Sequence, residues 1–379
     1  MPGGRLRTDA AQTQPRRSSD AALTQRPAGA KQSGMGLDIS IDAIVANWRS
    51  LAARAPGARA GAVLKADAYG LGADRVAPAL HAAGARDFFV ALPSEGRAIR
   101  PLLPGDARIL VLSGPLPGDA DMAGLIPVLN SAEQFFRDRV TRRKGAFAIQ
   151  LDTGMNRLGM ERAEWAAVRS EALAAVTGDG TGPALVLSHL ANADEPDHPS
   201  NAAQLAEFRA MTDGVTAPRS LSATGGILLG PDYHFDVTRP GIGLYGGAPF
   251  ADARPVVSLD LPVIQTRAVR AGEGVGYGYA WTAPRDCRIA TVAAGYADGI
   301  LRALSGSELS LWAGDRACPV VGRVSMDLLT VDVTELPDMP DALSLLNERQ
   351  RVDDVARLAG TIGYEILASL GTRYPRNWS

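Results

Sequence analysis

Short apolar runs alternate with helical patterns over roughly the first two thirds of the chain. Apolar residues at 41–51 recur at helical spacing, and Ser40 just before them suits a helix N-cap. Apolar runs follow at 61–64, 88–92, 109–112, 125–129, 147–151, 185–190, 220–223 and 235–237. Helical stretches lie between most of these runs, for example at 131–143, 162–176 and 202–212.

This alternation, repeated about eight times, predicts a parallel (β/α)8 barrel over residues 37–258. Barrels of this kind hold their functional residues at the carboxyl ends of the strands. A doubly wound open sheet produces the same alternation, and periodicity alone does not separate the two folds.

The pattern changes near residue 260. Apolar runs at 263–269, 287–293, 309–312 and 328–333 are separated by Ala-Gly, Gly-Asp and Pro signals without long helices. Such spacing predicts a mostly antiparallel β domain over 259–379. Helical patterns return at 352–359 and 364–370.

Residues 1–36 contain almost no large apolar residue and are rich in Arg, Gln, Ser, Ala, Pro and Gly. A segment of this composition cannot bury enough surface to offset its ordering entropy, so we predict a disordered tail. Its Arg-rich, acid-poor composition loosely resembles a transit peptide. A solvated tail, or translation that starts at Met35, is the preferred interpretation.

Composition narrows the classes of function. The chain has 379 residues, enough for two domains, and a net charge of −2, which gives no basic field for nucleic acid. Two cysteines are too few for a disulfide framework, and the four histidines form no spaced cluster that predicts a metal site. No apolar run is long enough to span a bilayer, so we expect a cytoplasmic protein.

One lysine stands out because Lys65 ends the apolar run at 61–64 and is followed at once by turn residues and glycines. A strand that ends in this way delivers a single amine to the mouth of a sheet. Partial desolvation there lowers the pKa of a lysine and makes its neutral amine available to condense with a carbonyl. A lone lysine at a strand end more commonly extends into solvent, so its neighbours have to decide.

The neighbours give Lys-Ala-Asp-Ala-Tyr-Gly at 65–70, which resembles the lysine motif of the alanine racemases. The resemblance implies that Lys65 holds pyridoxal 5′-phosphate as a Schiff base and that Tyr69 lies close to its phosphate. Further motifs follow in the family's order, so the resemblance covers about residues 37–379. It implies an isomerase that interconverts L- and D-alanine, for peptidoglycan synthesis or for alanine catabolism.

The phosphate of the cofactor needs donors, and 222–227 is a small-residue loop between a strand and a helical turn. Backbone N–H groups at such a helix start bind phosphate, and the Thr224 hydroxyl can add a donor. The family has an Asn-Ser pair where this chain has Ala-Thr, so the hydroxyl is kept and the asparagine is not. By resemblance, Gly241 and Ile242 supply backbone donors, and Tyr364 also contacts the phosphate.

The segment at 239–246, Arg-Pro-Gly-Ile-Gly-Leu-Tyr-Gly, also matches the family and implies that Arg239 faces the pyridine nitrogen. A guanidinium does not give up a proton at usable pH, so the ring nitrogen stays unprotonated and the ring withdraws electrons less strongly. This should suppress transamination and favour simple proton exchange at Cα.

Racemisation needs two proton carriers on opposite faces of the substrate, and the resemblance implies Lys65 and Tyr277. Tyr277 lies in Gly-Val-Gly-Tyr-Gly at 274–278. A tyrosine with an ordinary pKa of about 10 is a poor base at neutral pH, so it needs a hydrogen-bond partner and a cationic field. His189 matches the histidine that holds this tyrosine and that connects to Arg239.

Substrate contacts are implied by three further motifs. Tyr296, in Gly-Tyr-Ala-Asp-Gly, matches the tyrosine that narrows the entrance, and Met326 with Asp327 matches the loop that binds the substrate carboxylate. Arg157 matches an arginine near the cofactor's phenolic oxygen and the carboxylate. Because the family's Tyr277, Tyr296 and Met326 equivalents reach the lysine of another subunit, the resemblance implies a head-to-tail homodimer with shared sites.

The sequence is also compatible with other functions. A racemase for another small amino acid such as serine, or one of broad specificity, would carry the same motifs. Decarboxylases of the same fold normally place an acid at the ring nitrogen, which Arg239 argues against. A non-catalytic carrier of pyridoxal phosphate would lack a second domain, so Tyr277 and Met326 argue for catalysis.

Many family members place a carbamylated lysine seven positions before the arginine, where this chain has Gln150. An amide cannot be carbamylated, although its oxygen could accept a hydrogen bond from Arg157. We therefore expect the racemisation rate to be the same in thoroughly degassed buffer and in buffer with bicarbonate. Activity that is lost on degassing and restored by bicarbonate would contradict this expectation.

Overall fold

The computed structural model describes residues 36–118, 121–142, 144–177 and 180–379. The predicted tail therefore lies almost wholly outside the described residues, and Gly36, its last residue, begins strand β1 (Gly36–Ile39).

Parallel strands form the first sheet, in the spatial order β11-β10-β7-β6-β5-β4-β3. In chain order they are β3 (Ala62–Val63), β4 (Asp87–Val90), β5 (Arg108–Val111), β6 (Ile126–Leu129), β7 (Ala148–Gln150), β10 (Leu185–Leu187) and β11 (Arg219–Ser220). Strands β4 and β6 are buried along their whole length, as expected where helices cover a parallel sheet.

An eighth strand closes this sheet into a barrel. Strand β12 (Val237–Thr238) pairs in parallel with β2 (Arg59–Ala60), which continues through Gly61 into β3. On its other side, Asp236 and Arg239 donate backbone hydrogen bonds to carbonyls of Arg219 and Ser222, at β11 and just beyond it. The predicted (β/α)8 barrel is confirmed, and closure excludes the open doubly wound sheet.

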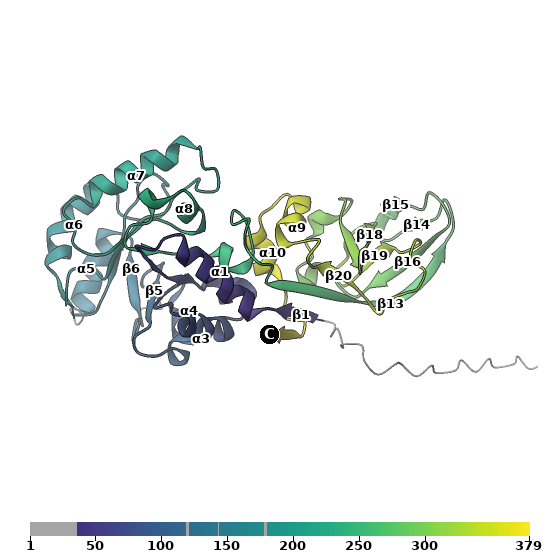
Figure 1. The fold of residues 1–379 in the computed structure, drawn as a ribbon, viewed down its shortest axis with the longest axis horizontal. Coiled ribbons are helices and arrows are strands. Elements are labelled where there is room, and N and C mark those ends of the chain that lie inside the picture. Colours follow the sequence, from purple (N-terminus) through teal and green to yellow (C-terminus); the bar gives the residue numbers. More distant parts are fainter. Residues whose placement is uncertain (1–35, 119–120, 143, 178–179) are drawn as a thin grey trace, which may run out of the picture. The chain divides into compact units, whose positions relative to one another are not determined.

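Helices surround the barrel strands (Figure 1). They are α1 (Ile41–Ala53), α3 (Ala73–Ala83), α4 (Pro93–Ile99), α5 (Ala132–Thr141), α6 (Arg162–Ala174), α7 (Pro199–Met211) and the short α8 (Thr224–Leu228). The predicted cap is present, because the Ser40 hydroxyl accepts from the Ala43 N–H at 3.3 Å. Ile44 and Leu51 on the apolar face of α1 are fully buried.

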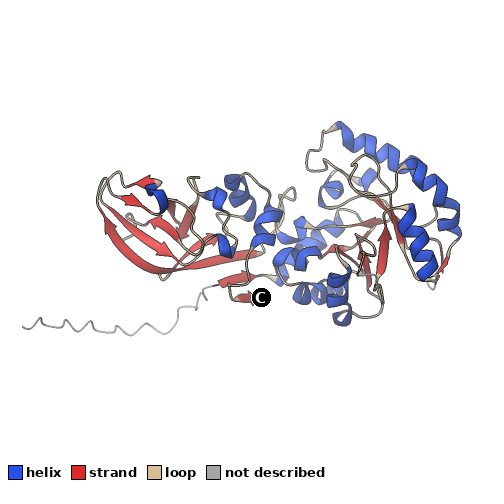
Figure 2. Cartoon of the chain, turned by 180° about the vertical axis from the view of Figure 1, so that it is seen from behind, coloured by secondary structure: helices blue, strands red, loops and turns tan. Residues whose placement is uncertain are grey.

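The second domain is built mainly of antiparallel strands, which Figure 2 shows in red. They are β13 (Val257–Val269), β16 (Cys287–Val292), β17 (Ser310–Ala313), β18 (Arg316–Val321), β19 (Leu329–Asp332) and β20 (Ala342–Leu346). The long strand β13 pairs with both β20 and β16, so these strands close on themselves. The predicted antiparallel β domain is confirmed.

Both ends of the described chain join this second sheet. Strand β1 pairs antiparallel with β13 and parallel with β21 (Arg376–Trp378). The first strand of the segment predicted as the barrel therefore lies in the sheet of the other domain. Sequence periodicity also gave no sign of β18, β20 or β21.

Two helices of the second domain reach the barrel. They are α9 (Val352–Ala359), which has the predicted bounds, and α10 (Gly363–Ser369), which packs against the turn after Lys65. Within the described residues, no helix has both the length and the apolar character needed to cross a bilayer.

Candidate active site

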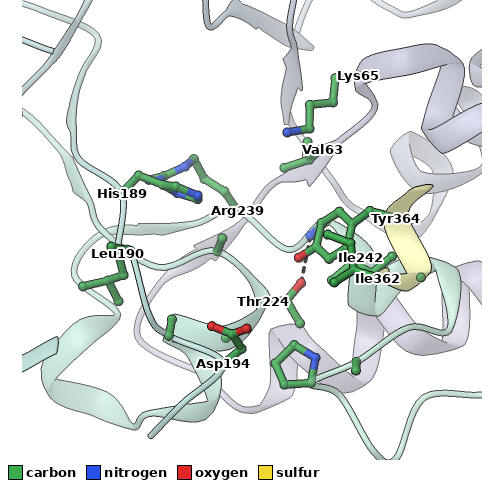
Figure 3. A pocket seen from close by; sticks show the side chains of 18 of the residues that line it. Val63, Lys65, His189, Leu190, Asp194, Thr224, Arg239, Ile242, Ile362 and Tyr364 are labelled. Atoms are coloured by element: carbon green, nitrogen blue, oxygen red, sulfur yellow. Dashed lines mark hydrogen bonds between the residues drawn. The ribbon is translucent and has the colours of Figure 1, made fainter. Parts of the chain in front are cut away.

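A cavity of about 830 Å³ lies at the carboxyl ends of the barrel strands. It brings together nine residues predicted from the sequence, several of which are labelled in Figure 3: Lys65, Tyr69, Arg157, His189, Thr224, Arg239, Gly241, Ile242 and Tyr364. Eight of them follow barrel strands, which is how this fold assembles a site from distant parts of the sequence, and Tyr364 comes from α10 of the second domain.

Lys65 follows β3 with only Leu64 between them, and the backbone after it turns left-handed. Residues 66–69 have φ between 53° and 57°, although none of them is glycine. This conformation costs roughly 1–2 kcal/mol for each L-residue, so its surroundings must hold it. The Asp67 carboxylate accepts from the Ala73 N–H at 2.7 Å, and the Glu95 carboxylate accepts from the Ala66 N–H at the same distance.

The Lys65 amine has a lowered pKa. Burial is the main cause, the nearby positive charge of Arg157 adds to it, and the negative charge of Glu95 opposes it. A lower pKa increases the fraction of neutral amine at a given pH, and only the neutral form is nucleophilic or basic.

Arg239 is only 4% exposed and is held by hydrogen bonds inside the barrel. Its guanidinium donates to the Ser220 hydroxyl and to the backbone carbonyls of Ser188 and Leu221. Burial lowers the pKa of Arg239 to about 10, so the group is still protonated at neutral pH. It can donate hydrogen bonds into the cavity but does not transfer a proton to a weakly basic nitrogen.

His189 lies close to Arg239 (Figure 3). Burial, followed by the positive charges of Arg239, Arg157 and Lys65, lowers the pKa of His189 to about 3. The imidazole is therefore neutral at neutral pH and can accept a hydrogen bond from one neighbour while donating one to another.

The small-residue loop at Thr224 is joined to the segment after Arg239. The Thr224 hydroxyl accepts from the Gly241 N–H at 3.0 Å and from the Gly243 N–H at 3.2 Å. The sequence predicts that the Thr224 hydroxyl and the Gly241 N–H each donate a hydrogen bond to the phosphate. In this structure the Gly241 N–H is instead bonded to Thr224.

Three aromatic rings pack along one side of the cavity. The Tyr69 ring lies 4.7 Å from the Tyr245 ring and 5.8 Å from the Tyr364 ring, measured between centroids. Burial raises the pKa of Tyr364 to about 12 and the pKa of Tyr69 further still. Both phenols keep their protons at neutral pH and can donate hydrogen bonds to an anion.

Gln150 is buried at the end of β7, and its amide nitrogen donates to the Leu158 carbonyl at 3.0 Å. This bond links the strand to the loop that carries Arg157, so the amide contacts that loop's backbone. The sequence allows the amide oxygen of Gln150 to accept from the Arg157 side chain, whereas the side-chain bond that the structure shows is the one to Leu158.

Four predicted residues of the second domain do not line this cavity. The Tyr277 side chain is 72% exposed and Met326 is 52% exposed. Backbone bonds from Tyr296 to Ser325 and from Ala297 to Met326 join the Tyr296 and Met326 loops. Asp327 accepts from the Arg373 guanidinium at 2.6 Å.

Comparison with known proteins places this geometry in a family. Residues 39–249 match the model described as alanine racemase, N-terminal domain, and residues 256–378 match its C-terminal domain. A relative named alanine racemase from Dinoroseobacter shibae is 60% identical over 348 residues, which cover 90% of this chain and 97% of the relative. The chain belongs to the alanine racemase family.

Solved structures of the family agree with this assignment. Alanine racemase from Bartonella henselae, with covalently bound pyridoxal phosphate, has a TM-score of 0.84 and 37% identity, covering 90% of this chain and 99% of that one. The biosynthetic alanine racemase from Pseudomonas aeruginosa has a TM-score of 0.82 and 37% identity, covering 91% and 99%.

The residues of the cavity fit the cofactor of this alanine racemase family. A lysine of lowered pKa suits the aldehyde, two protonated phenols suit the phosphate, and a buried arginine suits the ring nitrogen. Among the described residues, no group of three or more His, Cys, Asp or Glu side chains is arranged to hold a metal ion.

Sequence reasoning missed some acidic residues of the cavity. Asp194 follows the His189 loop, and Asp353 comes from α9 in the second domain. The Asp353 carboxylate accepts from the Ala248 N–H at 2.8 Å, which ties α9 to the end of the barrel segment. Periodicity along the sequence carries no signal for such a contact between residues more than a hundred positions apart.

The bonds of Thr224 predict the effect of removing its hydroxyl. Thr224→Val keeps the shape but leaves two buried N–H groups without their acceptor, so the free energy of unfolding should fall by about 1–3 kcal/mol. Thr238→Val is the matched control, because the buried Thr238 hydroxyl has no hydrogen-bond partner within the described residues. Denaturant unfolding of both variants measures the difference, and an equal loss of stability in the two would contradict the assigned role.

Proposed function

We propose that this chain interconverts L- and D-alanine with pyridoxal 5′-phosphate attached at Lys65. The observation that carries this proposal is a partly buried lysine of lowered pKa facing a cavity that also contains a buried, protonated arginine. Family membership and the relatives named alanine racemase supply the substrate class.

The cofactor, when bound, supplies an aldehyde for amines and a ring that withdraws charge from the Cα of an attached amino acid. Tyr69, Tyr364, the Thr224 hydroxyl, which still has its own proton to donate, and the Ile242 N–H are the groups that would hold its phosphate, since the Gly241 N–H is bonded to Thr224. Arg239 would face the ring nitrogen, and it keeps its own proton because its pKa remains near 10 despite burial.

Lys65 would hold a proton on one face of the substrate, since its desolvated amine changes protonation state more readily than an exposed lysine. Arg157 would orient the substrate carboxylate and maintain a positive field beside the amine. Neutral His189 would transmit a hydrogen bond from the Arg239 region toward the proton carrier on the opposite face.

Tyr277 would be that second carrier, supplied by a second copy of the chain. Its side chain is largely exposed in the single chain, and those of Tyr296 and Met326 are about half exposed, which suits residues that complete a partner's site. We therefore propose a homodimer in which Tyr277, Tyr296, Met326 and Asp327 act at the Lys65 cavity of the partner.

The two segments of the chain would have different roles. Residues 37–258 would hold the cofactor, and residues 259–379 would supply the second proton carrier and the carboxylate-binding loop. We propose a cytoplasmic location, where the alanine pool is available. No helix among the described residues has the features of a membrane span.

Turnover of several L-amino acids by the purified chain, followed by optical rotation, tests the function. L-alanine should lose its rotation fastest, and Lys65→Ala should lose both turnover and the visible absorption of the attached cofactor. Faster loss with L-serine would assign a different substrate, and full turnover by Lys65→Ala would contradict the role of the amine.

Tyr277→Phe tests the two-carrier arrangement. The variant should keep the cofactor's absorption but exchange protons from one face of the substrate far more slowly, by about 10²-fold or more. Uptake of solvent deuterium into L- and D-alanine measures the two faces separately. Equal uptake from both enantiomers would remove Tyr277 from this role.

A further inference from the structure

Glu95 lies outside the cavity lining, yet its carboxylate bonds directly to the turn that carries Lys65. One oxygen accepts from the Ala91 and Leu92 N–H groups at 2.7 and 3.1 Å, which caps the first turn of α4. The other oxygen accepts from the Ala66 N–H at 2.7 Å. A capping role uses only the first oxygen, so the second bond needs another explanation.

The Ala66 bond falls at the start of the left-handed turn, directly after Lys65. On the other side of the lysine, the Leu64 N–H donates to the Phe89 carbonyl at 2.8 Å. The N–H groups of the residues on either side of Lys65 are thus tied to the β4–α4 segment, that of Leu64 through the strand and that of Ala66 through Glu95. Such a pair of bonds fixes the direction in which the lysine side chain leaves the backbone.

We propose that Glu95 is a positioning residue that holds the left-handed turn at Ala66 and thereby aims the Lys65 amine into the cavity. The proposal rests on the proposed function, because it assigns the amine a catalytic task. A displacement of about 1 Å at a reacting group can lower a rate about 10²-fold, so the bond matters for turnover even though Glu95 touches no substrate.

The charge of Glu95 acts in the same place. It partly offsets the positive charge of Arg157 beside the Lys65 amine. A neutral glutamine at this position would remove that charge and also replace an acceptor oxygen with an amide donor. Aspartate would keep the charge while shortening the side chain by one methylene, which withdraws it from Ala66 but leaves an acid in the first turn of α4.

The test uses full-length holoenzyme with Glu95→Gln, Glu95→Asp and, as a matched control, Ser131→Ala. Ser131 caps α5 after barrel strand β6, where its hydroxyl accepts from the Gln134 N–H at 3.1 Å. The control therefore removes a helix cap on the same barrel without a bond to the lysine turn. Deuterium exchange of the peptide over 64–72, thermal unfolding, kcat and KM are measured for each.

The Glu95 variants and Ser131→Ala each weaken a helix cap, so each should lower the unfolding temperature by a few degrees. Only the Glu95 variants should speed exchange over 64–72, by about tenfold or more, and lower kcat by about tenfold with KM for alanine changed less than about twofold. Unchanged exchange over 64–72 in both Glu95 variants would overturn the proposal. If Ser131→Ala and Glu95→Asp have equal effects on exchange and kcat, Glu95 acts only as a helix cap and the proposal is wrong.

The exchange measurement does not depend on catalysis, so it separates this proposal from the proposed function. Faster exchange in a chain that turns over no alanine would leave the positioning role standing and remove the activity. If Glu95→Gln does not fold, Glu95→Asp, which keeps the acid, gives the same comparison.

Discussion

Burial of one amine at the end of a closed barrel is the constraint on which the site depends. At neutral pH a lysine in water is almost entirely protonated, and the protonated amine is neither a nucleophile nor a base. Here the barrel removes solvent from Lys65, and Arg157 makes its charged form still less favourable. Four left-handed residues follow Lys65, and carboxylates of Asp67 and Glu95 hold this turn by accepting from backbone N–H groups.

The cavity concentrates positive charge that its own walls do not fully neutralise. Burial, followed by the positive charges of Arg239, Arg157 and Lys65, lowers the pKa of His189 and keeps that imidazole neutral. A site with several cations and protonated phenols favours an anionic ligand with phosphate and carboxylate groups. Neutral His189 is useful among these cations, because a charged imidazole could not accept a hydrogen bond.

The hydrogen bonds of Arg239 hold one of these positive charges in a fixed place in the barrel. Its guanidinium bonds to Ser220 in β11, to Leu221 just beyond it and to Ser188 just beyond β10, so the order of these strands in the barrel also fixes the arginine. Its side chain cannot move toward or away from a ligand without breaking these buried bonds. The second domain contributes differently, since α9 and α10 complete the cavity wall while Tyr277 and Met326 remain at the surface.

The sequence determined the kinds of element and most of the chemistry, because apolar periodicity and local motifs depend on neighbouring residues. It predicted the barrel strands, helix α9 and the lysine, histidine and arginine that line one cavity. Only the tertiary structure decided that β1 pairs with β13, that Thr224 accepts from Gly241, and that Glu95 and Asp353 tie distant segments to the site. These contacts join residues far apart in the chain, and no local pattern encodes which strand end or helix start will become a neighbour.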